Sequence, residues 1–112
     1  MKKKICFDID GVICKTSGNN YKKSKPIKKA IKKINFLKKN FYIILFTARF
    51  MGRSKDKVSL AKKRAKKLTL QQLENWGVSY DKIIFGKPSY DYIVDDKSYN
   101  FDRKWFDKFR PK

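Results

Sequence analysis

The chain has 112 residues, of which 41% are hydrophobic and 15% aromatic, and its formal net charge at pH 7 is +20. This length suits one small domain with a single hydrophobic core, so we expect residues 1–112 to form one domain. The composition excludes a disordered chain, and no apolar run approaches the roughly 20 residues that a membrane-spanning helix needs. Acidic residues interrupt the first apolar run, which argues against a signal peptide.

The positive charge has two interpretations. Lysines are spread along the chain, as in KKAIKKINFLKK and AKKRAKKL, beside many Ile, Asn, Phe and Tyr residues. This mixture favours a compositional origin in an A·T-rich genome, while nucleic-acid binding stays as the alternative. In either case the positive field attracts small anionic substrates. Cys6 and Cys14 lack the spacing of a metal site and indicate a reduced, cytoplasmic protein.

The first half of the chain predicts a strand, a polar loop, a helix and a second strand. Residues 4–9 form a short apolar run that ends beside Asp8, and CKTSGNNYKKSK follows as a loop or hairpin flap. Pro26 suits the first turn of a helix that ends near Asn40. The apolar residues with helical spacing in it are Ile27, Ala30, Ile31, Ile34 and Leu37. Residues 41–46, FYIILF, predict a strand that is covered on both faces.

The second half predicts a long helix, two short strands and a last helix. After the loop TARFMGRSKD, the helix is expected from about Asp56 to Asn75, and its basic stretch KKRAKK is an exposed excursion. Residues 82–85 and 91–94 predict the strands. Ser98 is a candidate cap for the last helix, whose apolar side chains are Phe101, Trp105, Phe106 and Phe109.

This alternation of strands and helices predicts an α/β fold with a small, mostly parallel sheet. Ligands bind beyond the carboxyl ends of such strands, and polar residues follow four of the apolar runs. These residues are Asp8 with Asp10, Thr47 with Arg49, Lys87, and Asp95 with Asp96. Asp8 and Asp10 would face the same side of a strand and repel each other, which a bound cation would relieve.

In order, FDIDGVI, ILFTAR, FGKP and YIVDD resemble the four motifs of the haloacid dehalogenase (HAD) superfamily of phosphohydrolases. The resemblance spans nearly the whole chain and implies a three-layer, Rossmann-like HAD fold. The stretches FDIDGVIC, YIILFTARFMGRS and IFGKPSYDYIVDDKSYN are similar to small phosphatases of capsule and surface-polysaccharide gene clusters. Larger relatives carry a cap domain, for which this chain has no room.

The resemblance implies a role for each acidic residue. Asp8 would be the nucleophile that forms an aspartyl-phosphate, and Asp10 would act as general acid and then as base. Mg²⁺ would be held by Asp8, the backbone carbonyl of Asp10 and the acidic pair, with Asp96 favoured as direct ligand and Asp95 acting through water.

It also implies roles for the other motif residues. Thr47 would donate hydrogen bonds to the phosphoryl group, Lys87 would neutralise its charge, and the backbone of Gly11 would approach it closely. Each of these groups also has a purely structural interpretation. If Lys87 is only part of a solvated turn, Lys97 is the alternative lysine for the site. Arg49 suits a second anionic group on the substrate, or it braces the acidic loop. The residues expected to line the entrance are Cys14, Tyr21 and Arg53.

The sequence therefore predicts a Mg²⁺-dependent phosphomonoesterase acting on a sugar or polyol phosphate in surface-glycan synthesis. A site without a cap either excludes water in another way, such as by forming a homo-oligomer, or accepts large or exposed substrates. The first alternative is a polynucleotide 3′-end phosphatase. The second is a non-catalytic basic binding module on the same fold.

Overall fold

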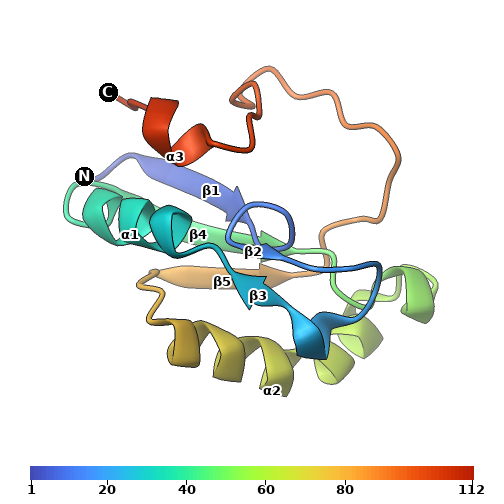
Figure 1. The fold of residues 1–112 in the computed structure, drawn as a ribbon. Coiled ribbons are helices and arrows are strands. Elements are labelled where there is room, and N and C mark those ends of the chain that lie inside the picture. The colour runs from blue at the N-terminus through green and yellow to red at the C-terminus, as the bar shows by residue number, and fades with distance from the viewer.

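The computed structural model describes all residues, 1–112, and its main sheet has three parallel strands (Figure 1). These strands are β1 (Lys4–Asp8), β4 (Tyr42–Thr47) and β5 (Lys82–Phe85), in the order β1-β4-β5. The short strands β2 (Cys14–Lys15) and β3 (Lys25–Pro26) form a separate antiparallel pair. The predicted α/β class with a small parallel sheet is confirmed, and β4 is the central strand.

Two longer helices connect the strands of the main sheet. Helix α1 (Lys28–Leu37) follows β3 and buries Ala30, Ile31, Ile34 and Leu37, as the periodicity predicts. Helix α2 (Val58–Trp76) follows β4 and ends at Gly77, whose φ of 72° allows the chain to leave the helix in a left-handed conformation. Two single turns of 3-10 helix, η1 (Tyr21–Lys23) and η2 (Gly52–Ser54), lie in the loops. No helix in the structure has the length and apolar character that crossing a membrane requires.

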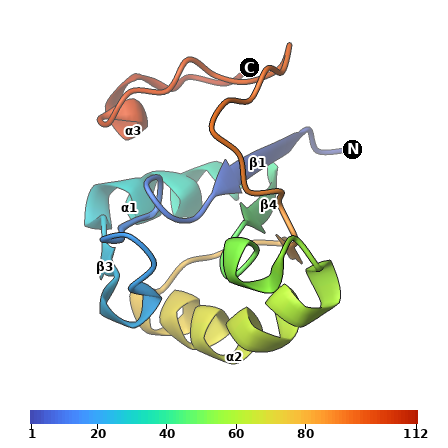
Figure 2. The ribbon, with the colours of Figure 1, turned by 90° about the vertical axis from the view of Figure 1, so that its right-hand side faces the viewer.

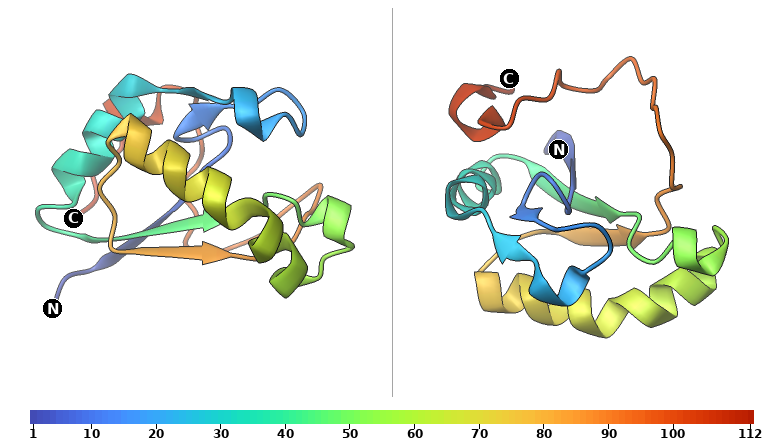
Figure 3. Two further views of the ribbon diagram at one scale, coloured as in Figure 1. Left: turned by 90° about the horizontal axis from the view of Figure 1, so that it is seen from below. Right: turned by 45° about the vertical axis from the view of Figure 1, so that its right-hand side comes forward.

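The hydrophobic core lies on one face of the sheet. Alternate residues of β4, Ile43 and Leu45, are fully buried in one cluster with side chains of α1 and α2. On the opposite face, Ile44 and Phe46 are only half-buried and Cys6 of β1 is exposed. The predicted coverage of β4 is therefore complete on the core face and partial on the opposite face, and this structure has no third layer. Figure 2 shows α1 and α2 beside the strands of the sheet, and Figure 3 shows the same elements from two further sides.

The C-terminal part of the chain departs most from the prediction. Residues 91–94 are not a strand but part of an exposed segment that runs away from the sheet, with Tyr92 and Val94 92% and 99% exposed (Figure 1). The last helix, α3 (Trp105–Lys108), is a single turn and does not begin at Ser98. It is held by aromatic packing, since the ring of buried Trp105 lies 5.1 Å from that of Phe7.

Gly86 marks the place where the chain leaves β5, and it provides a first prediction. Its φ is +98°, and a Cβ added there would lie 2.6 Å from Cγ1 of Val58, at the start of α2. We expect Gly86→Ala to lower the free energy of unfolding by about 1–3 kcal/mol, through backbone strain and displacement of Val58. Chemical denaturation measures the free energy of unfolding. Gly52→Ala is the control, because a Cβ at Gly52 meets nothing within 4 Å. Equal stability of the two variants would contradict the prediction.

Candidate active site

Three of the predicted site residues meet at the carboxyl edge of the sheet. Asp8 ends β1 opposite Phe46, and Thr47 ends β4 opposite Phe85 of β5. The backbone N–H groups of Gly86 and Lys87 both donate to the carbonyl of Thr47, at 3.2 and 3.0 Å. This pairing extends the contact between β4 and β5 by two residues and directs Lys87 toward the end of β1. The parallel register therefore explains why residues far apart in sequence share one edge.

Asp8 and Lys87 form an ion pair at this edge. The Nζ of Lys87 lies 3.3 Å from Oδ2 of Asp8, whose Oδ1 accepts a hydrogen bond from the N–H of Ile9 at 2.9 Å. Burial raises the pKa of Asp8, and the nearby charge of Lys87 only partly opposes this effect. Burial alone would lower the pKa of Lys87, but its contacts with Tyr90 and Asp8 outweigh it and raise that pKa. The carboxylate of Asp8 is thus partly buried, remains accessible, and lies beside one positive charge.

A tight loop follows Asp8 and fixes the backbone around Asp10. The N–H of Gly11 donates to the carbonyl of Cys14 at 2.8 Å, and that of Ile13 donates to the carbonyl of Ile9 at 2.9 Å. Gly11 has a φ of +87°, which accounts for a glycine at this position. The carbonyl of Asp10 accepts no backbone or side-chain hydrogen bond. It is therefore an unused oxygen ligand two residues from Asp8.

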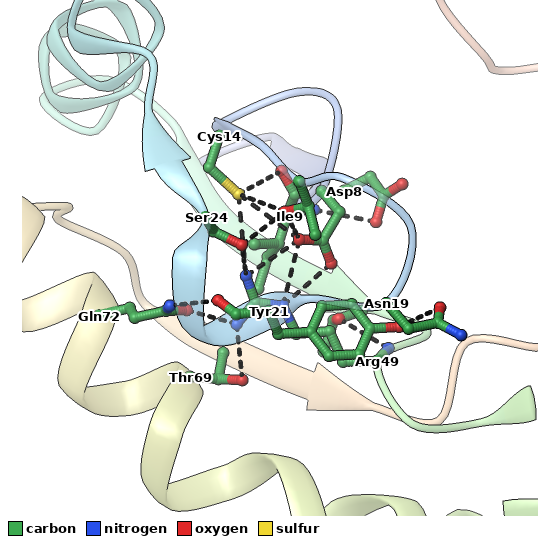
Figure 4. A network of polar contacts seen from close by, with 12 residues as sticks. Asp8, Ile9, Cys14, Asn19, Tyr21, Ser24, Arg49, Thr69 and Gln72 are labelled. Carbon is green, nitrogen blue, oxygen red and sulfur yellow. Dashed lines mark hydrogen bonds and ion pairs between the residues drawn. The ribbon is translucent and has the colours of Figure 1, made fainter. Parts of the chain in front are cut away.

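Arg49 lies in a network of polar contacts (Figure 4), and its guanidinium holds the side chain of Asp10. The guanidinium donates through Nε to Oδ2 and through Nη2 to Oδ1, both at 2.9 Å. Thr16 adds a third donor, its hydroxyl lying 2.6 Å from Oδ1. This two-pronged contact between a guanidinium and a carboxylate is a strong and directional ion pair. Asp8 and Asp10 therefore each have a positive partner within the protein, which reduces the repulsion between them.

Arg49 itself is buried and fully engaged with the protein. Its side chain is 0% exposed, and Nη1 donates to Oγ1 of Thr69 at 3.2 Å and to Oε1 of Gln72 at 2.5 Å. Its guanidinium also stacks over the ring of Tyr21, 5.0 Å from the centroid. Of the two roles expected for Arg49, the structure shows the bracing of the acidic loop, and binding of a second anionic group of a substrate stays a prediction.

Thr69 and Gln72 are contributors that sequence reasoning missed. Both are buried and lie on the inner face of α2 with Ala61, Ala65 and Leu73. Polar residues at core positions of an amphipathic helix require buried partners. Polar residues at these two positions of the helix therefore predict a buried polar or charged partner facing α2, but they do not identify that partner as Arg49.

Thr47 is also buried, and its hydroxyl oxygen accepts a hydrogen bond from the N–H of Arg49 at 3.0 Å. The side chain thus shapes the turn that leads to Arg49. A hydrogen bond from this hydroxyl to a phosphoryl group stays a prediction.

The acidic pair Asp95–Asp96 is not brought to Asp8. Both residues are exposed, and Asp95 caps a local turn by accepting from the N–H of Lys97 at 2.9 Å. No group of three acidic, histidine or cysteine side chains is arranged to hold a metal ion. The expected convergence of Asp95 and Asp96 with the first strand is therefore absent, because residues 91–94 do not join the sheet.

The three residues expected at the entrance have different positions. Cys14 is buried, its Sγ lies 3.5 Å from Oδ1 of Asp10, and burial raises the pKa of its thiol to about 11. Tyr21 and Arg53 line an open cavity of about 480 Å³. Its other lining residues come from the polar loop before β3, from Phe50 near the turn η2 and from Leu68 of α2, and the ring of Tyr21 also contacts the guanidinium of Arg49.

Comparison with known proteins supports the fold and leaves the activity open. No protein-family model matches the chain, and neither does any curated protein. A crystal structure of an MCSG target from Vibrio cholerae is similar to it, with a TM-score of 0.83 and 23% sequence identity. The similarity covers 96% of this chain and 89% of that chain. At this identity the likeness concerns the fold alone.

Proposed function

We propose that the protein is a Mg²⁺-dependent phosphomonoesterase of the HAD type, with Asp8 as its nucleophile. One observation carries the proposal: an accessible carboxylate and a lysine ammonium lie 3.3 Å apart at the carboxyl edge of a parallel sheet. A nucleophile and an adjacent positive charge at this edge are the minimum that phosphoryl transfer needs. The order of the four sequence motifs supports the same chemistry.

The proposed reaction has two steps. An oxygen of Asp8 attacks phosphorus as the ester oxygen leaves with a proton, and water then hydrolyses the resulting aspartyl-phosphate to inorganic phosphate. The raised pKa of Asp8 indicates a carboxylate that is poorly solvated and hence more nucleophilic. Lys87 stands where it would neutralise the charge of the phosphoryl oxygens.

Asp10 is assigned the transfer of a proton to the leaving ester oxygen in the first step and the removal of a proton from the attacking water in the second. In the structure its carboxylate accepts from Arg49 and Thr16, so this role requires the side chain to turn away from those donors. The hydroxyls of Thr16 and Ser24 lie 2.6 Å apart. When Asp10 turns away, the Thr16 hydroxyl can therefore donate its hydrogen bond to Ser24 instead.

The residues present fit Mg²⁺ in a limited way. The carboxylate of Asp8 and the free carbonyl of Asp10 supply two hard oxygen ligands, and Mg²⁺ often keeps waters and substrate phosphate for the rest of its shell. When bound, the ion would polarise the phosphoryl group and reduce its repulsion of the nucleophile. In the described conformation this role rests on Asp8 and Asp10 and not on Asp95 or Asp96.

The proposed substrate is a small phosphorylated sugar or polyol, as in surface-glycan synthesis. No cap covers the site, and the cavity lined by Tyr21, Phe50 and Arg53 offers aromatic faces and a positive charge close to it. Aromatic rings and a guanidinium suit a polyhydroxylated ring that carries a negative group.

The proposal is tested by measuring phosphate release from a panel of sugar phosphates, polyol phosphates, nucleotides and p-nitrophenyl phosphate. We expect turnover with Mg²⁺, loss of turnover in EDTA, and its return when Mg²⁺ is added in excess. The fold should persist in EDTA, as circular dichroism would show, because Asp8 and Asp10 already have cationic partners. Undiminished turnover in EDTA would overturn the role of the ion, and no turnover of any ester would favour the binding module.

A further inference from the structure

Helix α2 carries an unusual concentration of charge on its outer face. Four lysines share one stripe with Ser59 and Leu70, and together they line an open groove of about 560 Å³; the lysines are Lys62, Lys63, Lys66 and Lys67. We call this set the lysine stripe. Its spacing of three and four residues places all its members on one side of the helix, over about 16 Å from Ser59 to Leu70.

None of these lysines has an acidic partner. The ion pairs of the structure involve Lys38, Lys87, Lys108 and Arg49, and none involves the lysine stripe. The only acidic residue of α2 is Glu74, two turns beyond Lys67. Lysines four residues apart on a helix repel each other, so the arrangement is unfavourable until a negative partner neutralises it.

From this geometry we propose that the lysine stripe binds the sugar–phosphate backbone of a nucleic-acid strand. Only one of the six groove residues is apolar, which is unlike the apolar and aromatic centre of a protein interface. A membrane-bound helix would need an apolar face to insert, and α2 buries its apolar face against the sheet. A row of point charges in a concave groove matches a row of phosphates, whose neutralisation needs no base contact.

The position of α2 links this surface to the candidate active site. The helix begins near the carboxyl end of β5 (Figure 3). The side chain of its first residue, Val58, lies against Gly86, next to Lys87. A strand lying in the groove would therefore have one end directed toward the edge that carries Asp8. This second step rests on the proposed phosphatase activity, and it adds a terminal phosphate of a polynucleotide to the sugar and polyol phosphates as a further substrate class of the same site.

Helix α1 offers a matched control for the experiment. It also carries four lysines in the same spacing, Lys28, Lys29, Lys32 and Lys33, and none of them lines the groove on α2. The Nζ of Lys33 lies over the ring of Phe36 at 6.0 Å, on the side of the molecule where α3 packs. If net charge alone attracts a nucleic acid, removing either set of four should have the same effect.

The test compares fourfold Lys→Gln variants of α2 and of α1 by fluorescence anisotropy with a labelled oligothymidylate of about 15 nucleotides. Each phosphate contact contributes about 0.7 to the slope of log affinity against log salt for a single strand. Losing four contacts lowers this slope by about 2.8, so the salt-induced weakening between about 50 and 200 mM becomes about 50-fold smaller. We expect this change for the α2 variant, retention of the slope in a fourfold Lys→Arg variant of α2, and a clearly smaller change for the α1 variant.

Equal slopes for the α1 and α2 variants would overturn the proposal, as would tighter binding of poly-glutamate or of anionic lipid vesicles than of the oligonucleotide. Gln and Lys have similar helix propensities, so the variants should fold, which circular dichroism verifies. Turnover of 3′- and 5′-phosphorylated oligonucleotides tests the link to the site: the α2 variant should raise KM for these and leave KM for p-nitrophenyl phosphate unchanged. Binding through the lysine stripe without turnover of any ester would refute the phosphatase and uphold the binding surface.

Discussion

Replacing Asp8 with asparagine should abolish phosphatase turnover, by a factor on the order of 10⁴ or more in kcat. The amide has the size and shape of the carboxylate but cannot attack phosphorus to form an acyl-phosphate. Its position beside Lys87 and its hydrogen bond from the N–H of Ile9 can both be kept. Single-turnover assays with the best ester from the substrate panel measure the loss, and trapping of a phosphorylated protein distinguishes a missing nucleophile from weak binding.

The same variant should be at least as stable as the parent protein near neutral pH in EDTA. Burial raises the pKa of Asp8 above its ordinary value of 3.8 despite Lys87, so the folded state disfavours the charged form. Between the unfolded and the raised folded pKa, the folded protein binds more protons, and stability falls as pH rises through that window. The asparagine side chain does not titrate, so the stability of the variant relative to the parent should rise over the same window and stay constant above it.

Denaturant unfolding at several pH values measures this difference, and effects of overall charge cancel between the two proteins. Asp102→Asn is a suitable control, since Asp102 pairs with Lys108 at the surface and its pKa is lowered by that contact. Its relative stability should change in the opposite direction with pH. Retention of most of the turnover by Asp8→Asn would show that Asp8 is not the nucleophile.

The part of the fold that sequence predicted well is the part with strong local signals. The periodicity of α1 and the apolar runs of β1, β4 and β5 identified these elements within about three residues, the largest difference being the end of α1 at Leu37 instead of Asn40. The last quarter was predicted poorly, because YIV is typical of a strand in composition but has no neighbour to pair with in the structure. Strand formation depends on a tertiary partner, and a short apolar run does not specify one.

The candidate site divides in the same way. Asp8 and Lys87 were predicted together because the carboxyl ends of parallel strands must share an edge. The partner of Asp10 was not predictable, since Arg49 offered two roles and its buried partner Gln72 lies 23 residues further along the chain. Only packing α2 against the sheet brings them together. The sequence thus indicated which side chains face the edge, but not which of them satisfy one another.

Loss of Arg49 should have the largest effect on stability of any substitution at this edge. Arg49→Met keeps much of the volume, but it leaves the carboxylate of Asp10 without its two-pronged partner and removes donors from Thr69 and Gln72. Breaking a buried ion pair from one side costs about 3–5 kcal/mol, against a total stability of about 5–15 kcal/mol for a domain. We expect chemical denaturation to show a loss in this range, and Arg49→Lys to lose less because it keeps the charge.

A double-mutant cycle shows whether the unpaired carboxylate is the cause. Adding Asp10→Asn to Arg49→Met removes the uncompensated charge, so the double variant should be more stable than Arg49→Met alone, with a coupling of about 1–3 kcal/mol. Arg53→Met is the matched control, because Arg53 is exposed and its guanidinium contacts Asn19 and the ring of Phe50 without an acidic partner. It should cost no more than about 1 kcal/mol. Additive losses in the cycle would mean that Arg49 stabilises the protein by packing and not by holding Asp10, and the acidic loop would then need another explanation.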